Sequence, residues 1–326
     1  MKRKMLNVPK GGYDGMKGFT IVEFLVAGLL SVIVLIAVVS SYFTSRKLND
    51  VANERLAIQQ DLRNAATLIV RDARMAGSFG CFNMSEHTEK DVVDSSNQTQ
   101  SFLSKPGAKQ ENKVISLKRS GTDNKLIPIA EFLNIGYQGF THRPNALIFQ
   151  YGIDDVNASA DTTVVSSCAA ISKPGKKILN LEDAKKELKI VSQDKQNGNI
   201  ARQRHVVNAY AVGRFGNNEE GLFRFQLDDQ GKWGNPQLLV KKVKRMDVRY
   251  IYVSGCPEDE DAGKEEQFKY TDKFDKSKNA VTPAGVEVLL DSGLDAKIAA
   301  FSDNSIYAYR INATIRGGNV CANRTL

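Results

Sequence analysis

The clearest chemical signal in the sequence is a carboxylate at the head of an apolar run. Glu23 closes a segment that begins with Gly18, Phe19 and Thr20, and the next 22 residues, Phe24–Ser45, contain no charge and no proline. An unpaired carboxylate costs a few kcal/mol inside a membrane, so Glu23 needs a partner or a function. Thr20 is one local partner, because a threonine N-cap and a glutamate three residues later form a capping box.

The second signal is a set of four cysteines, Cys81, Cys168, Cys256 and Cys321. The membrane topology argued below places them outside the cytoplasm, where an even number of cysteines predicts disulfides; three pairings are open. We favour Cys81–Cys168 with Cys256–Cys321, because each bridge joins successive parts of the chain. No spacing is C-x-x-C, which disfavours the alternative of a zinc site. We therefore expect two disulfides, no metal and no other cofactor.

The remaining reactive side chains form no catalytic pattern. His87, His142 and His205 are isolated from one another, and the sequence contains no nucleophile elbow, phosphate-binding loop or dinucleotide-binding fingerprint. We interpret the histidines as structural and expect that the protein is not an enzyme.

Two charged clusters have a functional and a plainer interpretation. The acidic run Glu258–Asp261, followed by Gly263, has the charge to attract Ca²⁺ but lacks the order of an EF-hand loop, so a solvated loop is favoured. The basic cluster Lys241–Arg245 has the charge to contact DNA phosphates, whereas a solvated strand edge that opposes aggregation is the favoured interpretation. DNA is expected as an indirect partner only.

The composition is that of a globular protein with an unusual N-terminus. The 326 residues are 42% hydrophobic and 25% charged, which excludes wholesale disorder. Residues 1–18 carry five of the 45 bases and one of the 37 acids, so about half of the net charge of +8 belongs to this leader. The basic excess is therefore weak evidence for nucleic-acid binding.

The apolar run is long enough to cross a membrane, which takes about 20 residues. The five bases before it predict a cytoplasmic N-terminus, with the bulk of the chain on the far side. A conventional cleavable signal is the alternative, but its apolar core would be shorter, and the exit Val38–Phe43 offers no clear small-residue cleavage site.

The pattern after the membrane segment predicts an α+β protein. Apolar residues continue at helical spacing to Ala76 without a proline, and Gly77 is a plausible stop. After Gly80 strand-like alternation dominates, as in Tyr307–Arg316 and Met246–Val253. Shorter strand candidates are Val114–Lys118, Leu147–Tyr151, Thr163–Ser166, Val206–Val212, Leu222–Leu227 and Val286–Leu290. A short helix is predicted over Leu181–Leu188 with Asn180 as its cap, within a mostly antiparallel β-rich domain.

The order of basic leader, Gly18, Phe19, Thr20, Glu23 and apolar run resembles the class III signal of type IV prepilins and pseudopilins. The resemblance implies that a prepilin peptidase cuts between Gly18 and Phe19, that Phe19 becomes an N-methylated terminus, and that Glu23 pairs with a terminal amine during filament assembly. The implied organisation is a cleaved leader over 1–18, a transmembrane helix over 19–47, an amphipathic helix over 48–77 and a periplasmic domain over 78–326.

The segment Arg74–Cys81 resembles the stretch after the helix in PilW-type minor pilins, with the aromatic residue displaced by one position to Phe79. Looser similarity in order continues through Tyr210–Val212, Gly221–Arg224 and Val248–Tyr250. The resemblance implies a bacterial inner-membrane protein that joins other minor pilins and the major pilin, primes pilus assembly at the tip, and supports motility, adhesion through a tip adhesin, or DNA uptake. The alternatives are a type II secretion pseudopilin and a membrane-anchored periplasmic enzyme or binding protein.

Overall fold

The computed structural model of the chain describes residues 18–88, 91–93, 126, 128–132, 135–143, 146–158, 162–172, 174, 180–188, 199–217, 220–228, 233–254, 267–272, 282–291 and 308–315. The chain divides into two compact units, Met1–Ala57 and Ile58–Leu326, which we call the N-terminal unit and the globular unit. The division falls inside the long helix, and not after residue 77, because the buried stripe of the helix begins at Ile58. The C-terminal part of this helix is therefore an integral element of the globular unit.

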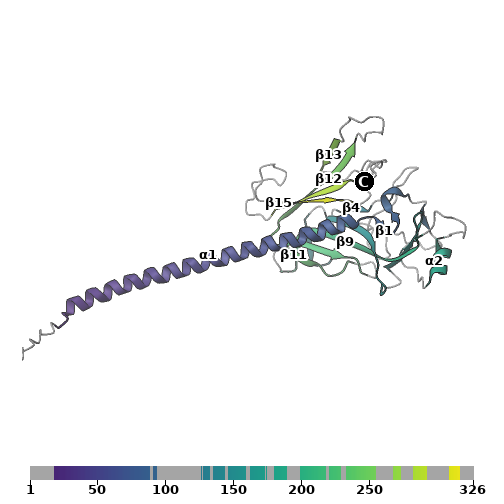
Figure 1. The fold of residues 1–326 in the computed structure, drawn as a ribbon. Helices are drawn as coiled ribbons and strands as arrows, with labels where there is room; N and C mark the ends of the chain where they lie inside the picture. The colour runs from purple at the N-terminus through teal and green to yellow at the C-terminus, as the bar shows by residue number, and fades with distance from the viewer. Residues whose placement is uncertain are drawn as a thin grey trace, which may run out of the picture. The chain divides into compact units, whose positions relative to one another are not determined.

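The long helix α1 runs without interruption from Ile21 to Met75 (Figure 1). Every residue from 18 to 57 is exposed, and α1 is long and apolar enough to span a membrane. The helix ends just before Gly77, whose φ of +80° lies in the left-handed region that favours glycine. A Cβ at this position would also lie 3.0 Å from the Cβ of Pro128, so both conformation and space require glycine at the predicted stop.

The globular unit is rich in strands. They are β1 (Ser78–Phe79), β2 (Phe82–Asn83), β3 (Val92–Val93), β4 (Ile129–Phe132), β5 (Phe140–His142), β6 (Ala146–Ile153), β7 (Thr163–Ser166), β8 (Ile171–Ser172), β9 (Ala201–Phe215), β10 (Gly221–Gln226), β11 (Gln237–Lys241), β12 (Arg245–Ser254), β13 (Gln267–Thr271), β14 (Gly285–Asp291) and β15 (Ala308–Thr314). Among the described residues, two short helices accompany the strands, the 3-10 helix η1 (Met84–Glu86) and α2 (Leu181–Glu187).

The strands form two main sheets and a small hairpin (Figure 1). In the nine-stranded sheet the main path is β11-β10-β9-β7-β8-β3, with β5 and β6 also paired to β9 and β4 paired to β6. The second sheet has the order β13-β12-β14-β15, and β1 pairs with β2. All pairings of the described strands are antiparallel except that of β3 with β8. The predicted α+β class, a long helix followed by a mostly antiparallel β-rich domain, is confirmed.

Strand alternation places the core residues of β9 in two of the three core clusters that the described residues form. On β9, Tyr210 and Val212 face one cluster, whereas Ala209 and Ala211 face the other. The first cluster joins the larger sheet to one face of the four-stranded sheet, to the buried stripe of α1 and to the residue that follows the helix, namely Leu62, Ala65, Ile69 and Ala73 of α1, and Ala76. Because burial of each large aliphatic side chain contributes about 1.5–3 kcal/mol, this stripe anchors the helix to the domain.

Several local predictions agree with the observed elements. β7 has the predicted bounds, and Asn180 caps α2 by accepting a hydrogen bond from the backbone N–H of Asp183 at 2.8 Å. The predicted strand Val114–Lys118 lies outside the described residues. The apolar stripe predicted from helical spacing begins at Leu48, but Leu48 is 65% exposed. The stripe is therefore buried over a shorter length than its helical spacing predicts.

Candidate functional site

The N-terminal motif, which consists of Gly18, Phe19, Thr20 and Glu23, forms a capping box. The Glu23 carboxylate oxygen Oε2 accepts hydrogen bonds from the Thr20 backbone N–H at 3.0 Å and the Thr20 hydroxyl at 2.9 Å. The Glu23 N–H in turn donates to Thr20 Oγ1 at 3.3 Å. These reciprocal bonds satisfy donors at the start of α1 that the helix itself leaves free.

The peptide bond between Gly18 and Phe19 is open to an approaching protein. Phe19 is 82% exposed, and a Cβ added to Gly18 would meet no atom within 4 Å. The described residues therefore give no steric reason for glycine at position 18.

The Glu23 side chain is oriented by hydrogen bonds but is exposed. In the part of the chain that the structure describes, the groups that contact its carboxylate are those of Thr20. Its neighbours Val22 and Phe24 are 68% and 74% exposed. A carboxylate that is oriented by its own N-cap and surrounded by exposed apolar side chains is available to a cation supplied by another molecule or by a new chain terminus.

A second carboxylate of α1, Asp72, has the opposite environment, because it is fully buried against the larger sheet. Its Oδ1 accepts from the Tyr151 hydroxyl at 2.9 Å. Its Oδ2 accepts from the Tyr210 hydroxyl at 2.6 Å and from Asn208 Nδ2 at 2.8 Å. We call Asp72 with Tyr151, Asn208 and Tyr210 the aspartate anchor.

Two cations compensate the charge of the aspartate anchor. The Arg71 guanidinium donates to Asp72 Oδ1 at 3.0 Å, and Arg224 Nη2 lies 3.7 Å from Oδ2. Burial, followed by the charge of Asp72, raises the pKa of the Tyr151 hydroxyl to about 12 and holds the pKa of Tyr210 well above its usual range. Both phenols therefore stay protonated and act as donors, which makes the anchor a structural group.

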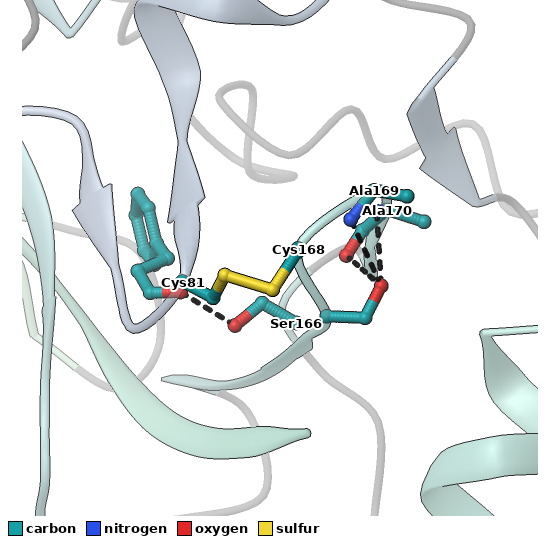
Figure 2. Close-up of a disulfide and its surroundings, with 7 residues drawn as sticks. Cys81, Ser166, Cys168, Ala169 and Ala170 are labelled. Carbon is teal, nitrogen blue, oxygen red and sulfur yellow. Dashed lines mark hydrogen bonds between the residues drawn. A yellow bond between two sulfur atoms is a disulfide. The ribbon is translucent and has the colours of Figure 1, made fainter. Parts of the chain in front are cut away.

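The disulfide Cys81–Cys168 joins the hairpin after α1 to the turn between β7 and β8 (Figure 2). Beside it, the Ser166 hydroxyl donates to the carbonyl of the buried Phe79 at 2.7 Å. Gly80 has a φ of +67°, and a Cβ there would lie 2.9 Å from the Cβ of Ala201. Because the bridge spans 87 residues of sequence, closing this loop stabilises the domain by about 4.6 kcal/mol in the chain-entropy model.

The other predicted site residues are placed as follows. Cys256, Cys321 and the acidic run over 258–261 lie outside the described residues. The side chains of Lys241, Lys242, Lys244 and Arg245 are exposed, while Val243 in the same cluster is buried.

The three histidines lie apart and have separate environments. His205 Nε2 lies 3.0 Å from Gln150 Oε1, and His87 stacks on Phe82. Burial lowers the pKa of His142 to about 4, so this imidazole is neutral near pH 7. Among the described residues no group of three or more His, Cys, Asp or Glu side chains is arranged to hold a metal ion.

Asp72 is the residue that sequence reasoning missed. A weak signal was present, since Asp72 is a charged residue next to Ala73 within the apolar stripe that also contains Ile69 and Ala76.

Comparisons of the chain with models of known protein families, with curated proteins and with solved structures found no match.

Proposed function

We propose that this chain is a minor pilin of the PilW type, a structural subunit that is cut between Gly18 and Phe19 and enters a type IV pilus through its apolar helix. The observation that carries the proposal is the environment of Glu23. This carboxylate is oriented at the start of a helix whose first 37 residues, Ile21–Ala57, are exposed. The apolar part of this exposed surface, Phe24–Ser45, needs a membrane or other helices to cover it.

Cleavage after Gly18 changes the electrostatics of the motif. It converts the amide nitrogen of Phe19 into an ammonium group, which lies one residue before the Thr20 cap and four residues before Glu23 in the sequence. In a poorly solvated environment an ammonium group and a carboxylate attract each other more strongly than in water. Glu23 then favours a terminal amine, its own or that of a neighbouring subunit, over the neutral donors of Thr20.

The segment that resembles PilW-type pilins also has a physical role at five of its eight positions. Ala76 and Phe79 are fully buried, Gly77 and Gly80 have left-handed backbone conformations, and Cys81 forms the disulfide. The segment thus ends the helix, reverses the chain and fastens it to the β-rich domain. A role of this kind suits a subunit whose helix must carry a rigid domain into an assembly.

This proposal assigns the chain structural partners and no catalytic activity. The partners are the major pilin, other minor pilins, and the peptidase that removes the leader at the inner membrane. The experiment is to shear filaments from cells and probe them for this chain. We expect the chain in the sheared fraction and fewer filaments in a deletion strain. A chain found only in membranes, with filament number unchanged on deletion, would contradict the proposal.

A further inference from the structure

A groove lies between α1 and the edge strand β15, within the globular unit. It has a volume of about 600 Å³ and is lined by side chains from the last four turns of α1 and by one tyrosine of β15, namely Arg63, Ala66, Thr67, Val70, Arg71, Arg74, Met75 and Tyr309. We call it the arginine groove. The roles described above for the capping box, the aspartate anchor and the disulfide do not explain why this groove is present.

The rim of the arginine groove is positively charged. Arg63, Arg71 and Arg74 are exposed and follow one another at intervals of eight and three residues, which places them along one stripe of the helix. Arg71 is paired with Asp72. Arg63 and Arg74 have no acidic partner among the described residues, so two guanidinium groups remain available to an anion.

The floor of the arginine groove is apolar and only partly covered. Ala66, Val70, Met75 and Tyr309 are each half-buried. β15 pairs with β14 on one side and with no described strand on the other. Arg310, the next residue along β15, already pairs with Glu287 at 3.2 Å and does not add to the rim.

We propose that the arginine groove binds an extended acidic segment of another protein, which adds as a strand to the edge of β15 that pairs with no described strand. The edge supplies unpaired backbone donors and acceptors, as in other cases of strand addition. Every second side chain of the added strand would face α1, where carboxylates meet Arg63 and Arg74 and an apolar side chain meets Val70 and Tyr309. This inference stands independently of the pilus function, because it concerns the globular unit alone.

The apolar floor favours a peptide over a nucleic acid. Phosphate binding needs clustered bases and makes no use of aliphatic side chains between them. A groove with two available arginines above an alanine, a valine and a tyrosine matches alternating carboxylate and apolar side chains instead. Charge complementarity at such a rim contributes mainly to specificity and to the association rate.

The test uses the full-length chain in detergent micelles and a fluorescent, end-blocked peptide of sequence Thr-Glu-Thr-Leu-Thr-Glu-Thr. We expect saturable binding by fluorescence anisotropy that weakens as salt is added. The double variant Arg63→Gln/Arg74→Gln should bind roughly 5- to 20-fold more weakly, since it removes two exposed ion pairs. The matched control Arg214→Gln/Lys241→Gln removes two exposed charges elsewhere in the globular unit and should bind like the wild type.

Three outcomes would overturn the inference. One is equal binding of a peptide in which glutamine replaces both glutamates. Another is equal binding of a peptide with alternate backbone nitrogens methylated, which cannot pair with a strand edge. The last is absence of peptide binding together with binding of a random-sequence DNA oligonucleotide that the Arg63→Gln/Arg74→Gln variant loses, since that result would assign the arginines to phosphate.

Discussion

Replacing Asp72 by alanine is expected to lower the free energy of unfolding of the globular unit by about 3–5 kcal/mol. The variant leaves the hydroxyls of Tyr151 and Tyr210 and the amide of Asn208 buried without their acceptor. It also leaves Arg224, whose side chain is only 15% exposed, without its counter-charge. Removing one member of a buried, hydrogen-bonded charge cluster is costly because the remaining members lose their solvation and their partner together.

Chemical denaturation of the full-length protein in detergent measures this effect. Trp233 is the single tryptophan of the chain and packs against Phe225 in the second core cluster, so its fluorescence reports unfolding of the β-rich domain. Asp61→Ala is the matched control on the same helix and should change stability by no more than about 0.5 kcal/mol. Equal destabilisation by the two substitutions would show that the aspartate anchor does not stabilise the docking of α1.

Glu23→Val is expected to reduce the amount of this chain in sheared filaments by about tenfold or more, while membrane insertion and leader cleavage continue. The expectation rests on the proposed function. Loss of the carboxylate leaves a terminal ammonium group without its partner in a poorly solvated environment, which weakens assembly by more than an exposed ion pair would. Insertion is preserved, because the substitution makes the apolar helix more apolar.

Two further variants separate assembly from helix capping. Glu23→Gln keeps a side chain that is accepted at this position of a capping box but removes the charge. Thr20→Val keeps the charge but removes the hydroxyl that bonds to Glu23 at 2.9 Å. Charge pairing predicts that Glu23→Gln fails in filaments like Glu23→Val and that Thr20→Val is incorporated. The reverse pattern would reduce the role of Glu23 to capping.

The fold was predictable where local patterns alone decide it. Gly77 ends α1 and Asn180 caps α2, because these positions depend on neighbouring backbone groups only. β9 is longer than its predicted span Val206–Val212. Its N-terminal residues Ala201–Arg204 pair with β7, a contact between segments about 40 residues apart that alternation within β9 does not reveal.

The candidate site was predictable to a smaller extent. Thr20 and Glu23 are three residues apart, so their capping geometry follows from the sequence. Asp72 meets Tyr151 and Tyr210 across 79 and 138 residues of chain, and only the packing of the helix on the sheet brings them together. Which side chains meet Asp72 depends on the register of the strands. A change of register by one residue would move every side chain of a strand to the other face of the sheet.

The most direct test of the account is the mass of the N-terminus of the protein extracted from membranes of its native host. The account predicts a chain that begins at Phe19, with the mass of one methyl group added to the terminal amine and the apolar segment Phe24–Ser45 retained. A chain that still carries residues 1–18, or one that begins near Ser41, would contradict it.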